Sequence, residues 1–125
     1  MIALDASAAL AFLFGEPGAE RVAELLDDSC MSTINLAEVI GRFARDGHDP
    51  RDVLQRIAES PVELVPFLAE DAALAAALIP TTRPLGLSLG DRACLALGLA
   101  RRIPVCTADQ AWLEVELDIG VEVIR

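Results

Sequence analysis

Residues 88–109 read SLGDRACLALGLARRIPVCTAD, and this stretch joins a helix to the strand that follows it. Ser88 and Asp91 match the capping-box spacing, which predicts a helix N-terminus at this point. The apolar run at residues 103–106 predicts a buried strand, which ends at Thr107-Ala108-Asp109. A helix that leads directly into a buried strand is typical of a βαβ unit, so the segment indicates a parallel sheet.

The rest of the chain repeats this alternation of strands and helices. Further strands are predicted at residues 1–5, 29–33, 62–65 and 121–124. Helices are predicted at residues 6–14, 17–28, 35–45, 49–60, 69–79 and 88–102, with a short helix around Trp112 and a loop at residues 81–86. The alternation predicts an α/β fold in which helices cover both faces of a mostly parallel sheet.

The bulk composition indicates one compact domain with apolar surface left for a partner. A chain of 125 residues has the size of one domain, so we expect residues 1–125 to form a single unit. Apolar residues make up 54% of the chain, and small domains bury a smaller share of their surface than large ones. The richest apolar runs, 8–14 and 72–79, are far shorter than the ~18 residues of a membrane helix, and no signal peptide precedes the first strand. We expect a cytoplasmic protein without membrane insertion.

The cysteines and the single histidine do not form a catalytic or zinc-binding set. Cys30, Cys94 and Cys106 lack the paired spacing of a zinc site, so we expect reduced, structural thiols. His48 stands in a turn-like Gly-His-Asp-Pro segment with no second imidazole to partner it. These observations disfavour zinc chemistry and catalysis by Ser-His-Asp or Cys-His.

The charge of the chain is informative about its partners. A formal charge of −10 disfavours nonspecific binding to nucleic acid, although bound cations would offset part of it locally. The chain has no lysine, and all ten basic residues are arginines, the better type for bidentate phosphate contact. A genome-wide composition bias explains this equally well. The candidates for phosphate contact are the arginines near the acidic motifs: Arg42, Arg45, Arg83 and Arg92.

Four acidic residues, Asp5, Glu38, Asp91 and Asp109, each stand where a strand or loop gives way to a helix. In an open α/β sheet, residues in this position tend to meet along the edge formed by the carboxyl ends of the strands. Carboxylates that meet there repel one another unless a hard cation lies among them. The pattern predicts a site for Mg²⁺ or Mn²⁺, and a metal-bound water would allow hydrolysis without histidine.

Helix capping is the alternative explanation for each acid taken singly. Asp5 and Asp109 precede helices that they could cap, and Glu38 falls in the first turn of its predicted helix, three residues after Asn35. Capping does not explain why all four acids fall at one edge of the sheet. It also does not explain why hydroxyl groups accompany two of them, in Asp5-x-Ser7 and Thr107-x-Asp109. For the set, a metal site is the better interpretation.

At these residues the sequence resembles the PIN-domain ribonucleases, in particular the VapC-type toxins of VapBC toxin–antitoxin modules. The resemblance spans nearly the whole chain and depends on the order and spacing of four motifs. These motifs are Ile2-Ala3-Leu4-Asp5-Ala6-Ser7, Ser32-Thr33-x-Asn35-Leu36-x-Glu38, Leu87-Ser88-Leu89-Gly90-Asp91-Arg92-Ala93-Cys94 and Pro104-Val105-x-Thr107-Ala108-Asp109-x-x-Trp112.

The resemblance implies a three-layer α/β/α sandwich with a five-stranded parallel sheet, and endonucleolytic cleavage of RNA with Mg²⁺ or Mn²⁺. By position, Asp5 and Asp91 would be the principal metal-binding carboxylates. Glu38 and Asp109 would complete the acidic pocket. The resemblance further implies a homodimer and inhibition by a small VapB-type antitoxin. The residues that would orient ligands or water are Thr107 and Ser7.

Two other classes of protein remain as alternatives. A receiver-type signalling domain is also small, α/β and acidic at its strand ends, but it relies on a lysine that this chain lacks. A noncatalytic interaction module with a PIN-like fold is the second alternative, and the intact set of acids counts against it. The sequence does not identify which RNA would be cut.

Overall fold

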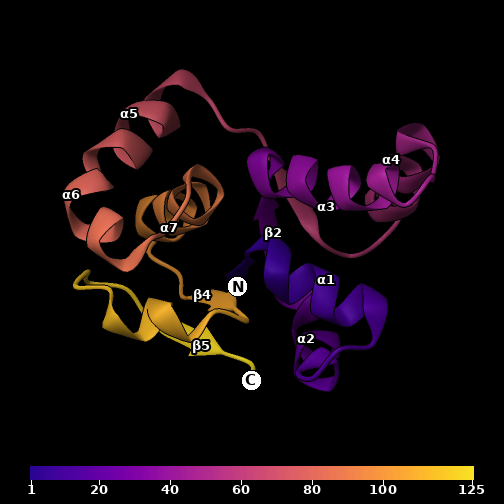
Figure 1. Ribbon diagram of the computed structural model, residues 1–125, viewed down its shortest axis with the longest axis horizontal. Helices are drawn as coiled ribbons and strands as arrows, with labels where there is room; N and C mark the ends of the chain where they lie inside the picture. Colours follow the sequence, from indigo (N-terminus) through magenta and orange to yellow (C-terminus); the bar gives the residue numbers. More distant parts are fainter.

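A five-stranded sheet forms the centre of the computed structural model, which describes residues 1–125 (Figure 1). Its strands are β1 (Ile2–Leu4), β2 (Ser29–Ser32), β3 (Glu63–Val65), β4 (Val105–Thr107) and β5 (Val121–Val123). They lie in the order β3-β2-β1-β4-β5, and every neighbouring pair is parallel. In the central strand, Ala3 is in register with Cys30 on one side and Val105 on the other. The sheet expected to be mostly parallel is parallel throughout.

Helices cover both faces of this sheet. They are α1 (Ala6–Phe14), α2 (Ala19–Leu25), α3 (Thr33–Arg45), α4 (Pro50–Ala58), α5 (Ala69–Ala77), α6 (Ile79–Thr82) and α7 (Leu89–Arg101), with 3₁₀ turns η1 (Leu26–Asp28), η2 (Arg83–Leu85) and η3 (Gln110–Glu114). Figure 1 shows α5, α6 and α7 on one side of the sheet and α1 to α4 on the other. The longest helices have 13 residues, and none has the length and hydrophobicity needed to cross a membrane.

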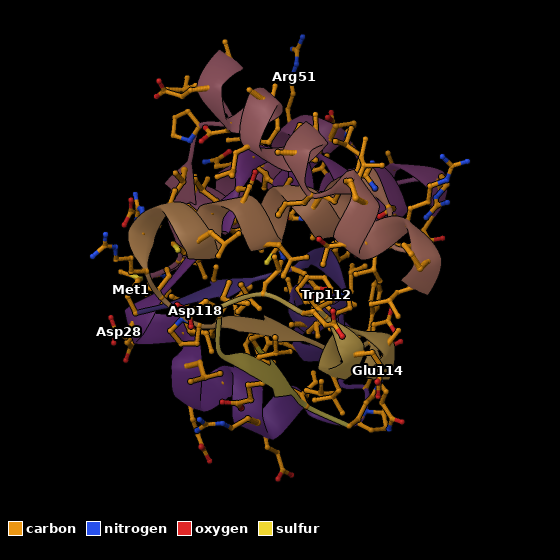
Figure 2. All side chains as sticks on the ribbon, turned by 90° about the vertical axis from the view of Figure 1, so that its left-hand side faces the viewer. Met1, Asp28, Arg51, Trp112, Glu114 and Asp118 are labelled. Atoms are coloured by element: carbon orange, nitrogen blue, oxygen red, sulfur yellow. The ribbon has the colours of Figure 1, made fainter.

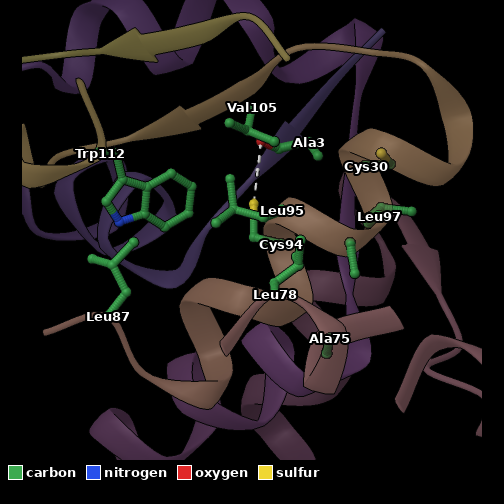
Figure 3. Close-up of a cluster of buried hydrophobic side chains, with 11 residues drawn as sticks. Ala3, Cys30, Ala75, Leu78, Leu87, Cys94, Leu95, Leu97, Val105 and Trp112 are labelled. Carbon is green, nitrogen blue, oxygen red and sulfur yellow. Dashed lines mark hydrogen bonds between the residues drawn. The ribbon is translucent and has the colours of Figure 1, made fainter. Parts of the chain in front are cut away.

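The alternation of side chains along β1 divides the core into two halves. Ala3 points to one face and packs with Cys94, Leu95 and Trp112, a cluster shown in Figure 3. Leu4 points to the opposite face and packs against the helices of the other layer. Because successive residues of a strand face opposite sides, one short apolar strand contributes to both halves. The predicted three-layer α/β/α sandwich is confirmed.

An ion pair holds the start of the central strand β1, at the end of the sheet opposite Asp5. The amino group of Met1 lies 2.8 Å from Oδ2 of Asp28, the last residue of η1. Figure 2 shows the two residues side by side at one end of the molecule, with Trp112 enclosed near its centre. The contact brings the turn that precedes β2 next to the start of β1.

The structure departs from the prediction most clearly at the start of α3 and at residues 81–86. The third helix begins at Thr33 with Ser32 as its N-cap, so Glu38 lies in its second turn and not in its first. The predicted loop at residues 81–86 is mostly helical, since α6 and η2 occupy residues 79–85. Pro80 fits there because a proline near the start of a helix lacks only an N–H that needs no helical partner.

Candidate active site

Asp5 stands at the end of β1 and its carboxylate is buried, with 3% of the residue exposed. As the N-cap of α1, it accepts a 2.8 Å hydrogen bond from the N–H of Ala8. The Ser7 hydroxyl lies 2.7 and 2.9 Å from its two oxygens, and the Thr107 hydroxyl donates to Oδ2 at 2.6 Å. The capping explanation for Asp5 is therefore correct. The same carboxylate also accepts hydrogen bonds from two side-chain hydroxyl groups.

Backbone N–H groups of the loop after β4 orient both hydroxyls. The N–H of Ala108 donates to Ser7 Oγ at 2.9 Å, and the N–H of Asp109 donates to Thr107 Oγ1 at 3.1 Å. Each hydroxyl oxygen can accept a bond from a backbone N–H while its own proton is donated to Asp5, and the two hydroxyl oxygens also lie 3.2 Å apart, within hydrogen-bond distance of each other. The predicted supporting residues Ser7 and Thr107 thus join the ends of two strands through one carboxylate.

These contacts lie at the point in the sheet where the order of the strands reverses. From β1 the chain proceeds through β2 to β3 on one side, whereas β4 and β5 lie on the other. In open α/β sheets, ligands bind outside the carboxyl ends of the strands at such a switch point. Asp5, Ser7 and Thr107 therefore occupy the position where this fold class binds its ligands.

Burial raises the pKa of Asp5 from 3.8 to about 6. The hydrogen bonds from Thr107, Ala8 and Ser7 act in the opposite direction, because they stabilise the charged form. Like-charge repulsion from the carboxylate of Asp91 acts in the same direction as burial and is the smallest of these effects, all of which are included in the pKa of about 6. Asp5 and Asp91, 86 positions apart in the sequence, are thus close enough in the fold to interact electrostatically.

Asp91 is half-buried in the first turn of α7. Its Oδ2 accepts a 2.8 Å hydrogen bond from the N–H of Ser88, and its own N–H donates to Ser88 Oγ at 3.3 Å. The predicted capping box is therefore confirmed. The capping bond uses Oδ2 and leaves Oδ1 without a hydrogen bond in the chain, so capping and ligand binding are compatible at this residue.

Glu38 approaches the same turn from α3. Its Oε1 accepts a 2.9 Å hydrogen bond from Asn35 Nδ2, which also donates to the Gly90 carbonyl at 2.9 Å. A Cβ atom on Gly90 would overlap the Glu38 carboxylate, so the two residues are in close contact. The capping explanation is wrong for Glu38, because Ser32 caps this helix and Asn35 instead links two helices.

Asp109, like Glu38, is exposed, whereas Asp91 is half-buried and Asp5 is buried. Oδ1 of Asp109 accepts a 2.9 Å hydrogen bond from the N–H of Ala111 at the start of η3. The backbone N–H of Asp109 belongs to the Thr107 network described above. The capping explanation is correct for Asp109, and its connection to Asp5 runs through Thr107.

A model of the PIN domain family matches residues 2–117. The chain belongs to the PIN domain family. Among solved structures, the fold is similar to a toxin–antitoxin complex from Klebsiella pneumoniae, with 20% identity and a TM-score of 0.75 over 100% of this chain and 98% of that one. It is also similar to FitAcB from Neisseria gonorrhoeae, with 24% identity and a TM-score of 0.71 over 98% of this chain and 96% of that one.

A third similar structure is VapBC2 from Rickettsia felis bound to a DNA fragment from their promoter, with 17% identity and a TM-score of 0.74 over 100% of both chains. No curated protein matches the sequence. At these identities, the similarity to the solved structures establishes the fold of this PIN domain.

The acids of this PIN domain line one edge of the sheet, but they do not form a closed cage. No three acidic, histidine or cysteine side chains stand close enough together to hold one ion by themselves. Mg²⁺ typically takes one or two carboxylates and completes its coordination with water and substrate oxygens, so a closed cage is not required. The buried Asp5 carboxylate beside Asp91 is a hard-oxygen pair that a divalent cation would stabilise, and the residues present therefore fit such an ion.

The four arginines predicted to contact phosphate have different environments. Arg42 pairs with Asp46 at 3.6 Å and lies 4.9 Å above the centre of the Phe14 ring. Arg92 donates through Nη1 to the carbonyl of Leu87 at 3.0 Å. The remaining two form no ion pair within the chain: Arg45 and Arg83.

Proposed function

We propose that this PIN domain is a metal-dependent endoribonuclease and the toxin of a VapBC-type module. One observation carries the proposal. The carboxylate of Asp5 is buried at the switch point of the sheet, and the neighbouring Asp91 raises its pKa by repulsion. Burying this charge beside a second acid destabilises the fold, and a divalent cation bound between the two would offset that cost.

Each acid has a role in this proposal. Asp5 and Asp91 would be the principal ligands of Mg²⁺ or Mn²⁺, and Glu38 and Asp109 would be further metal-binding carboxylates that complete the acidic pocket. An ion held by these residues would supply an activated water for attack on the RNA phosphodiester and would offset charge on the phosphoryl oxygens. The residues that keep the Asp5 carboxylate charged and oriented are Thr107 and Ser7, because their hydroxyls donate to it.

The RNA substrate would reach this edge although the protein carries a charge of −10. Arg45 and Arg83 are exposed and form no ion pair, so their guanidinium groups are free to contact phosphate. Arg42 and Arg92 would first have to give up the contacts with Asp46 and Leu87. We therefore rank Arg45 and Arg83 ahead of the other two as phosphate contacts.

Partner binding forms the second part of the proposal. An apolar pocket of about 120 Å³ lies between α1, α4 and the sheet. Phe12, Leu13 and Ile57 are among the residues that line it, and Arg56 is its only charged one. We propose that a VapB-type antitoxin covers this face and that the toxin forms homodimers, which accords with the apolar excess of so small a chain.

Metal titration of the purified chain tests the proposal. Isothermal calorimetry with Mn²⁺ should detect uptake by the wild type and a strong loss of affinity in Asp5→Asn and Asp91→Asn. Cleavage of a mixed RNA substrate should require Mg²⁺ or Mn²⁺ and be lost in the same variants. The matched control is Asp118→Asn, which neutralises an exposed acid. Asp118 lines a surface pocket together with Pro104, the residue before β4, and so lies toward the opposite edge of the sheet. Metal uptake without cleavage of any RNA would favour a noncatalytic module.

A further inference from the structure

Asn35 is a buried polar residue that connects two helices at the acidic edge. It lies in the first turn of α3 and is 1% exposed. Its Nδ2 has two protons, and one hydrogen bond goes to Glu38 Oε1 while the other goes to the carbonyl of Gly90, both at 2.9 Å. Gly90 directly precedes Asp91 in α7. One side-chain nitrogen therefore joins Glu38 to the turn that carries Asp91.

The other half of the Asn35 amide has no partner. Its Oδ1 is buried and accepts no hydrogen bond. An unpaired buried carbonyl oxygen destabilises the folded state, and an apolar side chain of similar size would fill the same space without that penalty. Packing therefore does not account for an asparagine at this position. The two hydrogen bonds that its Nδ2 donates do account for it.

Gly90, like Asn35, is a residue that disfavours folding at its position but allows the contact with Glu38. Glycine in the interior of a helix is less favourable than alanine because its backbone loses more conformational freedom. A Cβ atom at this position would overlap the Glu38 carboxylate. That carboxylate is the far end of a flexible side chain, so it can move out of the way. Alanine would consequently be tolerated by the fold, and the carboxylate would have to move away.

We propose that Asn35, with the space left by Gly90, is a positioning residue that holds the Glu38 carboxylate against the first turn of α7, beside Asp91. The inference rests on the proposed nuclease function, to which it adds a residue that touches neither metal nor RNA. Asn35 acts only through Glu38. Substitution of Asn35 should therefore change the position of the Glu38 carboxylate without preventing the chain from folding.

The test compares four variants of the full chain with the wild type. Asn35→Leu removes both hydrogen bonds and fills the space, and Gly90→Ala displaces Glu38 without touching Asn35. Glu38→Gln and the double variant Asn35→Leu/Glu38→Gln complete a double-mutant cycle. Ser29→Ala is the matched control, because it removes a 2%-exposed side chain whose hydroxyl bonds to Leu26 O at the opposite end of β2. The readouts are the midpoint of thermal unfolding, the Kd for Mn²⁺ by calorimetry, and kcat and KM for RNA cleavage.

We expect Asn35→Leu and Gly90→Ala to keep or raise the unfolding midpoint while weakening Mn²⁺ binding about 10- to 100-fold, as is common when a residue that orients a metal ligand is removed. The loss in RNA cleavage should fall on kcat rather than KM. In the Glu38→Gln background, Asn35→Leu should have no further effect on the Kd for Mn²⁺. Ser29→Ala should leave the Kd and kcat at wild-type values.

Three results would overturn the inference. If Asn35→Leu changed the Kd for Mn²⁺ by the same factor in the wild type and in Glu38→Gln, the two residues would act independently. Wild-type Mn²⁺ affinity in both Asn35→Leu and Gly90→Ala, in a chain that does bind Mn²⁺ and cleave RNA, would remove the inference and leave the proposed function intact. Absence of Mn²⁺ binding and cleavage in the wild type itself would instead refute the proposed function and the inference with it.

Discussion

The hydroxyl of Thr107 donates a 2.6 Å hydrogen bond to Oδ2 of Asp5, which lies 102 residues earlier in the chain. The two residues stand at the ends of β4 and β1, the adjacent strands on either side of the switch point. The bond is the shortest that the Asp5 carboxylate accepts, and it opposes the rise in pKa caused by burial. The protonation state of the central acid therefore depends on a contact between the two halves of the sheet.

Substitution of Thr107 by valine should move the pH dependence of the reaction. Thr107→Val removes the strongest of the hydrogen bonds that stabilise charged Asp5, so its pKa rises further above about 6. The acid limb of the pH profile for RNA cleavage should shift to higher pH, with activity largely retained on the alkaline side. Thr82→Val, which removes another buried hydroxyl, one that donates to Leu78 O, serves as the control. An unshifted profile in Thr107→Val would contradict the assigned role.

The stability of the metal-free protein should fall as the pH rises from about 4 to about 6. Because the pKa of Asp5 is about 6 in the folded protein and 3.8 is its usual value, the folded chain holds a proton that the unfolded chain has lost across this window. The two-unit difference corresponds to at most about 3 kcal/mol. Asp5→Asn should flatten this part of the curve and raise the unfolding midpoint near pH 7. Urea unfolding across the pH range measures both effects, and parallel curves for the two proteins would count against the buried charge.

Divalent cations should oppose that loss of stability. A ligand that binds only the folded state raises the free energy of unfolding by about 2.7 kcal/mol at 100 times its Kd. We expect Mn²⁺ and Mg²⁺ to raise the thermal midpoint of the wild type and to have little effect on Asp91→Asn. The increase should be larger near pH 7 than near pH 5, where protonated Asp5 is a poor ligand. Equal shifts in the wild type and the variant would place the binding elsewhere.

Two glycines with positive φ provide a matched pair for a test of packing. Gly15 ends α1 with φ 64° and has open space where a Cβ would lie, whereas at Gly18, with φ 96°, a Cβ would stand 2.6 Å from Ile124 Cδ1. Gly15→Ala should cost about 1 kcal/mol through backbone strain alone. Gly18→Ala should cost roughly 1–3 kcal/mol more, because the side chain after β5 must move. Chemical denaturation compares the two, and equal losses would exclude the contact.

The three thiols should be unreactive until the protein unfolds. Cys30, Cys94 and Cys106 are free and buried. Burial raises the pKa of each, to about 12 for Cys106. The thiolate is the reactive form, so modification by a disulfide reagent at about pH 8 should follow the rate of unfolding. All three should react rapidly in denaturant, and fast labelling of the native protein would contradict their burial.

The parts of this fold that were predicted well carry their signals locally. The first helix runs from Ala6 to Phe14 as expected, because Asp5 caps one end and Gly15 adopts the left-handed conformation at the other. The capping box of Ser88 and Asp91 likewise needs only four consecutive residues. Such signals depend on hydrogen bonds between near neighbours, which any reading of the sequence can recognise.

The errors arose where two local signals competed. Ser32 and Asn35 are both good N-cap residues, and the structure uses Ser32 because the Asn35 side chain is engaged with Gly90, 55 residues away. The helix predicted at residues 69–79 stops before Pro80, but Pro80 lies in the first turn of α6, which begins at Ile79. A cap or a proline is compatible with more than one local structure, and packing against distant residues selects among them.

Periodicity, capping chemistry and motif order are properties of the amino-acid order, and they suffice to predict the alternation of strands and helices, the acids at helix starts and the resemblance to the PIN family. Three contacts follow from the folded chain alone: Thr107 bonds to Asp5, Asp91 raises the pKa of the same carboxylate, and Asn35 joins Glu38 to Gly90. Strand order and helix packing create these pairs, because burial of apolar faces brings together segments that no local hydrogen bond connects.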